Sequence, residues 1–126
     1  MSIIHEKHYL YPEHILIRKF IGKTSGKDIV DSWEYLHKNN LINKKIKGVI
    51  NDLSDCELIM DMEKFKTLLN FMKNQDYLKN IKLAVISDNP EIIVFPFLGK
   101  EQERTLKIKP FSTMEAAVNW IAIDIS

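Results

Sequence analysis

The C-terminal end of the chain carries the pattern that most constrains its fold, a short strand followed by a capped amphipathic helix. The strand is predicted over residues 106–109, and Ser112 and Glu115 follow at the spacing of a capping box, in which each side chain bonds the other residue's backbone N–H. Behind this cap, five apolar residues fall on one helical face: Met114, Ala117, Val118, Ile121 and Ile125. Upstream segments repeat the order of strand, turn and helix, so the sequence predicts an α/β fold.

The predicted elements follow the order β-β-α-β-α-β-α-β-α. The first two strands form an antiparallel hairpin around Pro12, and the apolar run within the fourth is typical of a central strand covered on both faces. The strands are expected over residues 3–11, 15–21, 48–53, 82–87 and 106–109. Ser25 and Asp61 are the predicted N-caps of the first two helices. Residues 89–91 are predicted to begin a third helix, which is short or kinked over residues 92–98. Residues 99–104 are predicted to form a charged loop. Right-handed crossovers between these strands predict a mixed four- to five-stranded sheet flanked by helices.

Length and charge restrict the class of protein. A chain of 126 residues without repeats or linkers is expected to form a single domain over residues 1–126. A net charge of +1 gives no electrostatic reason to expect binding to nucleic acid or to an anionic membrane. The sequence contains one cysteine, Cys56, and no apolar run of the ~20 residues that a membrane span needs. We therefore expect a cytoplasmic protein without membrane insertion.

The residue types that carry catalysis are present but poorly arranged. Gly22-Lys23-Thr24 lacks the glycine five residues earlier that a phosphate-binding loop needs, and the histidines have no cluster of cysteines or carboxylates beside them. The acidic neighbours of Cys56 oppose formation of a reactive thiolate. We expect no catalytic, cofactor or metal site, and hence no enzyme.

Polar residues collect where two predicted parallel strands end. In open α/β sheets, ligands bind in the crevice beyond the carboxyl ends of the strands. A loop predicted over residues 54–60, together with the start of the second helix, supplies apolar Ile59, Met60 and Met62 among acidic neighbours, a composition that suits an interface. The candidate surface for a partner or ligand is Asp52, Ser54, Asp55, Glu57, Met60, Asp61, Met62, Ser87 and Asp88. The same residue types also serve as ordinary caps and turns, and the apolar ones also suit the core beneath the loop.

Residues near the C-terminus resemble a known family. The run Leu83-Ala84-Val85-Ile86-Ser87-Asp88 and, further on, Phe111, Ser112, Glu115, Ala116, Trp120 and Ile121 are similar to the C-terminal half of STAS-like (SpoIIAA-like) domains. The resemblance implies a compact mixed sheet and non-enzymatic binding of proteins. Antagonists of that family switch by phosphorylation of a serine directly after an aspartate, and the corresponding place here is Asp61-Met62-Glu63. Because Met62 has no hydroxyl, that phosphoswitch is not expected.

Three functions remain open from the sequence. The first is a STAS-like regulatory module that binds a protein partner or a second copy of itself. The second is a receiver-like phospho-switch at Asp52, suggested by the Lys109-Pro110 junction, although the pair of acids that binds Mg²⁺ is missing after the strand over residues 15–21. The third is a carrier of a small apolar ligand, to which residues 92–98 contribute a lid.

Overall fold

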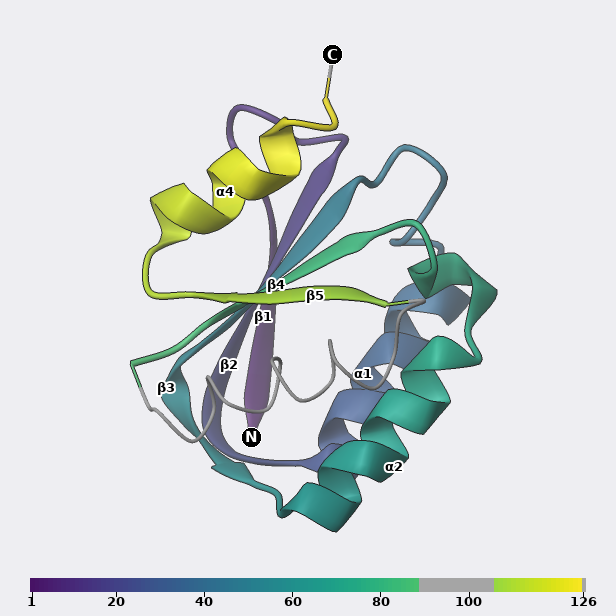
Figure 1. Ribbon diagram of the computed structural model, residues 1–126, viewed down its shortest axis with the longest axis vertical. Helices are drawn as coiled ribbons and strands as arrows, with labels where there is room; N and C mark the ends of the chain where they lie inside the picture. Colours follow the sequence, from purple (N-terminus) through teal and green to yellow (C-terminus); the bar gives the residue numbers. More distant parts are fainter. Residues whose placement is uncertain (89–105, 126) are drawn as a thin grey trace.

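The computed structural model describes residues 1–88 and 106–125, and these residues build one mixed sheet (Figure 1). The strands are β1 (Ser2–Lys7), β2 (Ile15–Ser25), β3 (Gly48–Ile59), β4 (Lys82–Ile86) and β5 (Lys107–Phe111). They lie in the order β1-β2-β3-β4-β5, with β1 antiparallel to β2 and every later pair parallel. The predicted mixed sheet is therefore confirmed, whereas the third helix, the segment over 92–98 and the charged loop lie outside the described residues.

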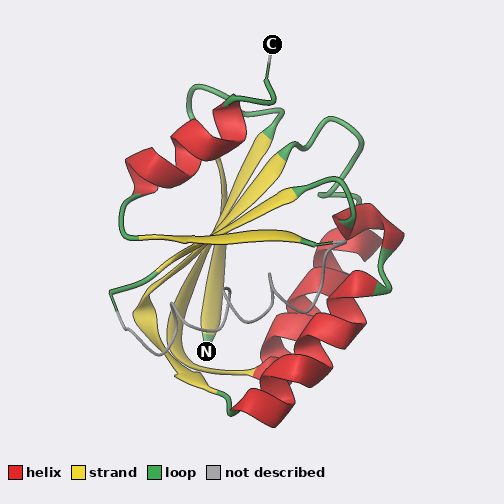
Figure 2. Cartoon of the chain, viewed as in Figure 1, coloured by secondary structure: helices red, strands yellow, loops and turns green. Residues whose placement is uncertain are grey.

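Helices cover both faces of this sheet (Figures 1 and 2). Helices α1 (Gly26–Lys38) and α2 (Met62–Lys73) pack side by side on one face, and a short 3₁₀ turn, η1 (Asp76–Leu78), follows α2. Helix α4 (Met114–Ala122) lies on the opposite face. None of the helices in the described part of the chain has the length and apolar character to cross a lipid bilayer.

Of the three predicted helix starts that fall within the described residues, two are confirmed. Ser25 and Asp28 form a reciprocal capping box at the start of α1, and the Asp61 carboxylate accepts from the Lys64 backbone N–H at 2.8 Å. The third prediction is wrong by one residue, because α4 is capped by Thr113, whose hydroxyl accepts from the Ala116 N–H at 3.2 Å. Strand β5 continues through Phe111, so the turn into α4 starts later than the capping-box spacing suggested.

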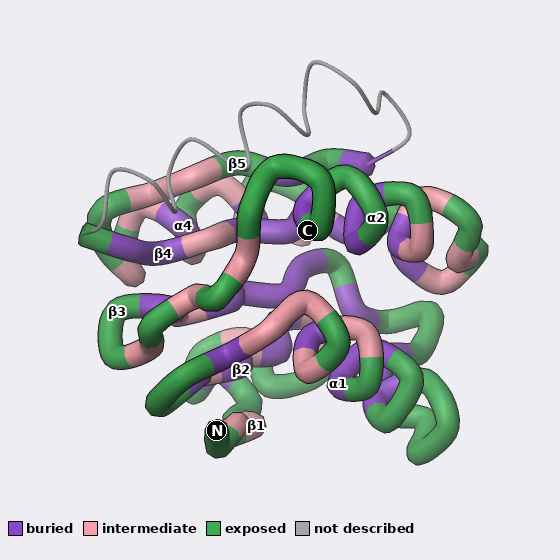
Figure 3. The backbone as a smooth tube through the Cα atoms, turned by 90° about the horizontal axis from the view of Figure 1, so that it is seen from below, coloured by how far each residue is buried: buried purple, intermediate pink, exposed green. Residues whose placement is uncertain are grey.

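Alternating side chains along the strands divide the core into two layers. On one face, Leu16 and Phe20 of β2 pack with Val49 and Leu53 of β3 beneath α1 and α2. On the other face, Ile50 belongs to a smaller cluster under α4, whose further members are Ile15, Ala84, Ile86, Ala117 and Ile121. In Figure 3, β4 is mostly buried while the labelled end of β3 is exposed or half-buried. The centre of the sheet is therefore covered on both faces, whereas the C-terminal part of β3 is accessible to solvent.

The largest difference from the sequence prediction is the length of β2 and β3. The residues predicted to form a loop over 54–60 continue β3 as far as Ile59, where Asp55–Ile59 pair with Ile21–Ser25 of a correspondingly longer β2. The register shifts between Lys19, opposite Asp52, and Ile21, opposite Asp55, which leaves one extra residue on β3. This β-bulge interrupts the apolar alternation after Leu53, so the sequence pattern predicted that the strand ends there.

At the other end of the sheet, β1 ends at Lys7 and not at residue 11. The Pro12 turn remains, with the His14 N–H bonded to the Tyr11 carbonyl at 3.1 Å and the His8 N–H to the Ile15 carbonyl at 3.1 Å. The sheet order also bears on the receiver-like alternative, because receiver folds have parallel strands in the order 2-1-3-4-5. The order and the antiparallel first strand observed here are not those of a receiver.

Candidate functional site

The predicted surface residues of β3 lie on a two-stranded extension that projects past the end of β4. Strand β4 ends at Ile86, opposite Asp52, so in the described structure the rest of β3 pairs on one side only, with β2. Along this extension Asp55, Glu57 and Ile59 are exposed, whereas Cys56 and Leu58 are half-buried against the core. The extension therefore presents one polar face to solvent and one apolar face to the core.

Charges on the exposed face are partly balanced. Lys19 and Asp55 form an ion pair at 2.9 Å, and the hydrogen bond to Asp55 raises the pKa of Lys19. Glu57 lies opposite Lys23 in the strand register. Both side chains of the ion pair are substantially exposed, so the pair adds little to stability but orders the carboxylate on this face.

The apolar part of the predicted surface lies at the junction of β3 and α2. Ile59, the last residue of β3, is 46% exposed, and Met62, the first residue of α2, is 37% exposed. Asp61 between them is exposed and caps the helix. Met60 differs from its neighbours because its half-buried side chain packs against the core. We call the exposed residues of this end of the molecule the tip surface: Ser54, Asp55, Glu57, Ile59, Asp61 and Met62.

The remaining predicted polar residues lie within β3 or directly after β4 and do not join the tip surface. Asp52 is half-buried, and its carboxylate accepts from the Ser54 N–H at 3.0 Å, which is the local bond that the extra residue in β3 requires. Ser87 is buried and Asp88 is exposed directly after β4. The nine predicted residues thus divide between the tip surface, the core side of β3 and the end of β4.

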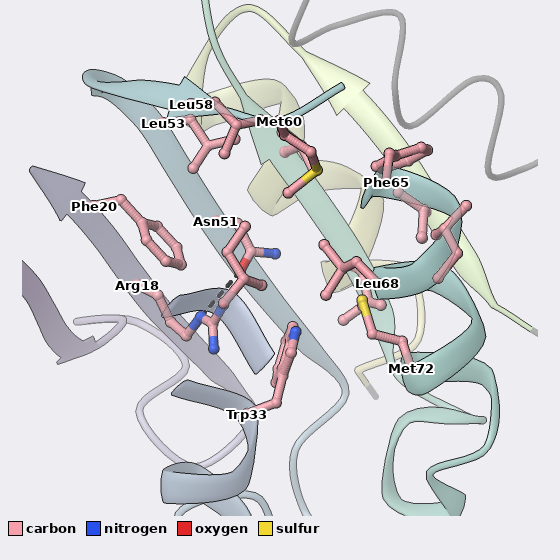
Figure 4. Close-up of a pocket in the computed structure, with 15 residues that line it drawn as sticks. Arg18, Phe20, Trp33, Asn51, Leu53, Leu58, Met60, Phe65, Leu68 and Met72 are labelled. Atoms are coloured by element: carbon pink, nitrogen blue, oxygen red, sulfur yellow. Dashed lines mark hydrogen bonds between the residues drawn. The ribbon is translucent and has the colours of Figure 1, made fainter. Parts of the chain in front are cut away.

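A cavity that the sequence prediction missed lies beneath the sheet extension, between β2, β3, α1 and α2 (Figure 4). Its volume is about 80 Å³, and nearly all of its wall is apolar. The polar residues of the lining are Asn51 and Arg18. Arg18, on β2, is only 1% exposed and lies between the rings of Trp33 and Phe20, with its guanidinium carbon 3.8 and 4.8 Å from the ring centroids. The residues that line the cavity include Met60, Leu68 and Met72.

Neutral groups hold the Arg18 guanidinium in place. Nε donates to Asn51 Oδ1 and Nη1 donates to Ser32 Oγ, both at 3.0 Å. Asn51 in turn donates to the Ala84 carbonyl at 3.1 Å, and Ser32 to the Ile29 carbonyl at 2.6 Å. Burial lowers the pKa of Arg18 to about 9, so the side chain remains a cation at neutral pH. The sequence signal was one charged residue on the apolar side of β2, between Leu16 and Phe20.

The cysteine is half-buried, and two of the histidines contact backbone groups. Burial raises the pKa of the Cys56 thiol, and the charges of Asp52 and Asp55 raise it further, which agrees with the unreactive thiol predicted from sequence. His8 is buried, where Nδ1 accepts from the Leu10 N–H at 3.2 Å, and His14 Nδ1 lies 2.8 Å from the Lys45 carbonyl. Over the described ranges, no group of three or more histidine, cysteine or acidic side chains is placed to hold a metal ion.

The chain resembles several solved structures along nearly its whole length. A protein of the DUF3478 family with a SpoIIAA-like fold, from Shewanella loihica PV-4, superposes with a TM-score of 0.63 at 17% identity, covering 95% of this chain and 92% of that one. The anti-sigma factor antagonist SpoIIAA in its unphosphorylated form gives 0.56 at 10% identity, covering 95% and 97%. The phosphorylated form of the Bacillus cell fate determinant SpoIIAA gives 0.57 at 13% identity, covering 95% and 99%.

No family model and no curated protein matches the sequence. The structural similarities nevertheless agree with one another, and with the observed order of strands and helices. The fold of the chain is therefore SpoIIAA-like, and the resemblance inferred from the C-terminal residues is confirmed at the level of the fold.

Proposed function

We propose that this SpoIIAA-like chain is a non-catalytic regulatory module that works in the cytoplasm and binds a protein partner through the tip surface. The observation that carries the proposal is the pair of exposed apolar side chains, Ile59 and Met62, on either side of the β3–α2 junction. Protein interfaces are built from an apolar centre with a polar rim. SpoIIAA, which has the same fold, is an anti-sigma factor antagonist, and such a role depends on recognition of another protein.

Charge determines the kind of partner that this surface suits. Exposed Asp55 and Glu57 precede Ile59 along β3, and Asp61 lies between the two apolar residues in the sequence. Asp55 is already paired with Lys19, and Glu57 lies opposite Lys23. Opposite charges across an interface increase the rate of association and select the partner. The tip surface therefore suits a partner that presents lysine or arginine around a small apolar patch.

Binding at this surface is not expected to be switched by phosphorylation of α2. Asp61 caps the helix and Met62 is its first residue, so the position that carries a serine in antagonists of the STAS-like family carries a thioether here. A thioether has no hydroxyl that could accept a phosphoryl group. We therefore propose constitutive binding at this position.

The test compares two charge reversals of the same kind at opposite ends of the sheet. Glu57→Lys changes the tip surface, whereas Glu13→Lys changes an exposed glutamate in the Pro12 turn. A photo-crosslinking residue in place of Ile59 first identifies the bound protein in cells, and the affinity of the purified pair is then measured. We expect Glu57→Lys to weaken binding about tenfold or more, with Glu13→Lys unchanged.

The melting temperature of both variants serves as the control for folding. Glu57 is exposed, so its reversal should leave the melting temperature within about 1 °C of that of the parent protein, since exposed substitutions seldom alter stability. Lower stability with undiminished binding would show that this end of the molecule is structural. Light scattering distinguishes a second copy of this chain from a different protein as the partner.

A further inference from the structure

We propose that the cavity around Arg18 binds a small hydrocarbon carboxylate, whose oxygens accept hydrogen bonds from the Arg18 guanidinium and the Trp33 indole N–H. This inference concerns a site beneath the sheet extension and does not depend on the partner proposed for the tip surface. It starts from a mismatch in the cavity, where a cation lies among largely apolar walls and its hydrogen bonds to the described residues go to neutral groups.

The first step is the charge of Arg18. Buried charges in proteins are normally paired with an opposite charge, because an unpaired ion loses its hydration without compensation. Within the described ranges no carboxylate forms an ion pair with Arg18, although the side chain is almost completely buried. The aromatic faces of Trp33 and Phe20 stabilise the cation but do not neutralise it. The described residues thus leave this charge without an opposite partner, and a bound anion would supply one.

The second step is the count of hydrogen-bond donors. A guanidinium has five N–H groups in a planar fork, and the bonds to Asn51 and Ser32 come from Nε and Nη1. Among the described residues, Nη2 has no hydrogen-bond partner. The buried Trp33 Nε1–H also lacks a partner there, and in Figure 4 the indole nitrogen faces the space between Arg18 and Leu68. Two unused donors therefore belong to residues that line the same cavity and that stack on one another.

The third step is the absence of competing acceptors in this wall. Asn51 Oδ1 accepts from Arg18 while its amide donates to Ala84, and Ser32 Oγ is bonded to both Arg18 and Ile29. These bonds fix the guanidinium and leave its free edge available. A carboxylate, with two acceptor oxygens and no donor, matches this free edge. An amine has nothing to accept its protons, and an alcohol leaves its own O–H without an acceptor and does not neutralise the cation.

The size and lining of the cavity define the hydrocarbon part. An apolar cavity of about 150 Å³ is large enough for benzene, and the volume of about 80 Å³ found here suits a shorter or branched chain. Met60 and Met72 line the cavity, and methionine side chains change rotamer at low cost, so a somewhat longer chain can be accommodated. The ligand class is a monocarboxylate with a short hydrocarbon chain.

The experiment uses the full chain and isothermal titration calorimetry with straight and branched carboxylates from propanoate to decanoate, each compared with the alcohol of the same skeleton. We expect saturable binding of at least one carboxylate, about tenfold or more tighter than its alcohol. Arg18→Met keeps an unbranched side chain of similar length without the charge, and it should abolish this preference. Lys45→Met makes the same change of charge at an exposed residue at the other end of the sheet and should leave binding unchanged.

A second variant covers the case in which Arg18→Met does not fold. Trp33→Phe retains an aromatic face over the guanidinium but removes the indole N–H, and it should weaken carboxylate binding a few-fold without weakening binding of the alcohol. Folding of each variant is checked by circular dichroism. Failure of every carboxylate in the series to bind, or equal affinities of carboxylate and alcohol for the parent protein, would overturn the proposal without reference to any variant.

Discussion

The contact between Gly48 and α4 allows a quantitative test of how the sheet is packed. Gly48 is the first residue of β3, and a Cβ built at this position would lie 2.5 Å from Cδ1 and Cγ2 of Ile121 and 2.6 Å from its Cγ1. Ile121 is completely buried between α4 and the sheet. Because real Cβ atoms do not approach other heavy atoms so closely, Gly48→Ala must displace the Ile121 side chain.

The expected cost follows from the number of atoms that clash. Adding a methyl group to a well-packed core costs about 1–3 kcal/mol. Since the new methyl would meet three atoms of one fully buried side chain, we expect the upper part of this range, about 2–3 kcal/mol in the free energy of unfolding. For a chain of this size, such a loss lowers the melting temperature by roughly 6–15 °C.

The assay is urea denaturation followed by circular dichroism, with Gly26→Ala as the matched control. Gly26 is the first residue of α1, and the nearest atom to a Cβ there is Met60 Cε at 3.5 Å, an ordinary contact distance. Gly26→Ala should therefore be neutral or stabilise the protein by up to about 1 kcal/mol, since alanine has the higher helix propensity. Equal destabilisation by both substitutions would mean that loss of glycine itself, and not the contact, is responsible.

A double-mutant cycle isolates the contact with Ile121. Ile121→Ala alone is expected to cost about 2–5 kcal/mol because it leaves a cavity under α4. In the double variant the alanine at position 48 fills part of that cavity. The destabilisation of the double variant should therefore be smaller than the sum of the two single-variant destabilisations by about 1 kcal/mol or more. Additivity within about 0.5 kcal/mol would refute the argument.

Three further predictions concern the helix caps and the thiol. Asp61→Ala removes the acceptor for the Lys64 N–H and should lower the free energy of unfolding by about 1 kcal/mol in urea titrations. The hydrogen bond from the Ser25 N–H lowers the pKa of Asp28 below its usual 3.8. The ionised carboxylate therefore stabilises the fold fully above pH 3.8, and this stabilisation is lost as the pH falls through the lower pKa of the folded state. Asp28→Asn should accordingly reduce the loss of stability between about pH 5 and pH 2, measured as urea midpoints. Because burial raises the pKa of Cys56, iodoacetamide at neutral pH should alkylate the folded protein more slowly than the protein in urea, and equal rates would contradict the burial.

Local chemistry made much of the fold predictable. The caps at Ser25 and Asp61 were predicted because a short polar side chain before an apolar helical stripe has a specific task, bonding a free backbone N–H. The two-sided burial of β4 was predicted from its uninterrupted apolar run, and the clusters on both faces confirm it. Each of these features depends on residues close together in the sequence.

The features that the sequence did not reveal depend on contacts between distant residues. The bulge on β3 is defined by pairing with β2, and without the partner strand the change in alternation after Leu53 resembles a loop. Arg18 alternates in the sequence with Leu16 and Phe20, which places it on their face of β2, but its burial depends on Trp33 of α1 and Asn51 of β3. A charged residue in an apolar alternation is therefore a signal to look for a neutral polar residue at the adjacent position of the neighbouring strand.

The bulge also decides which side chains of β3 face the helices. The extra residue between Asp52 and Asp55 shifts the phase of the strand, so that Cys56 and Leu58 turn toward the helices and Glu57 toward water. Regular pairing of the same residues without the bulge would exchange the two sets, because neighbouring side chains of a strand point to opposite faces. Acidic side chains would then face the helices, whereas deletion of the one extra residue would remove the bulge and leave Cys56 and Leu58 on the buried side.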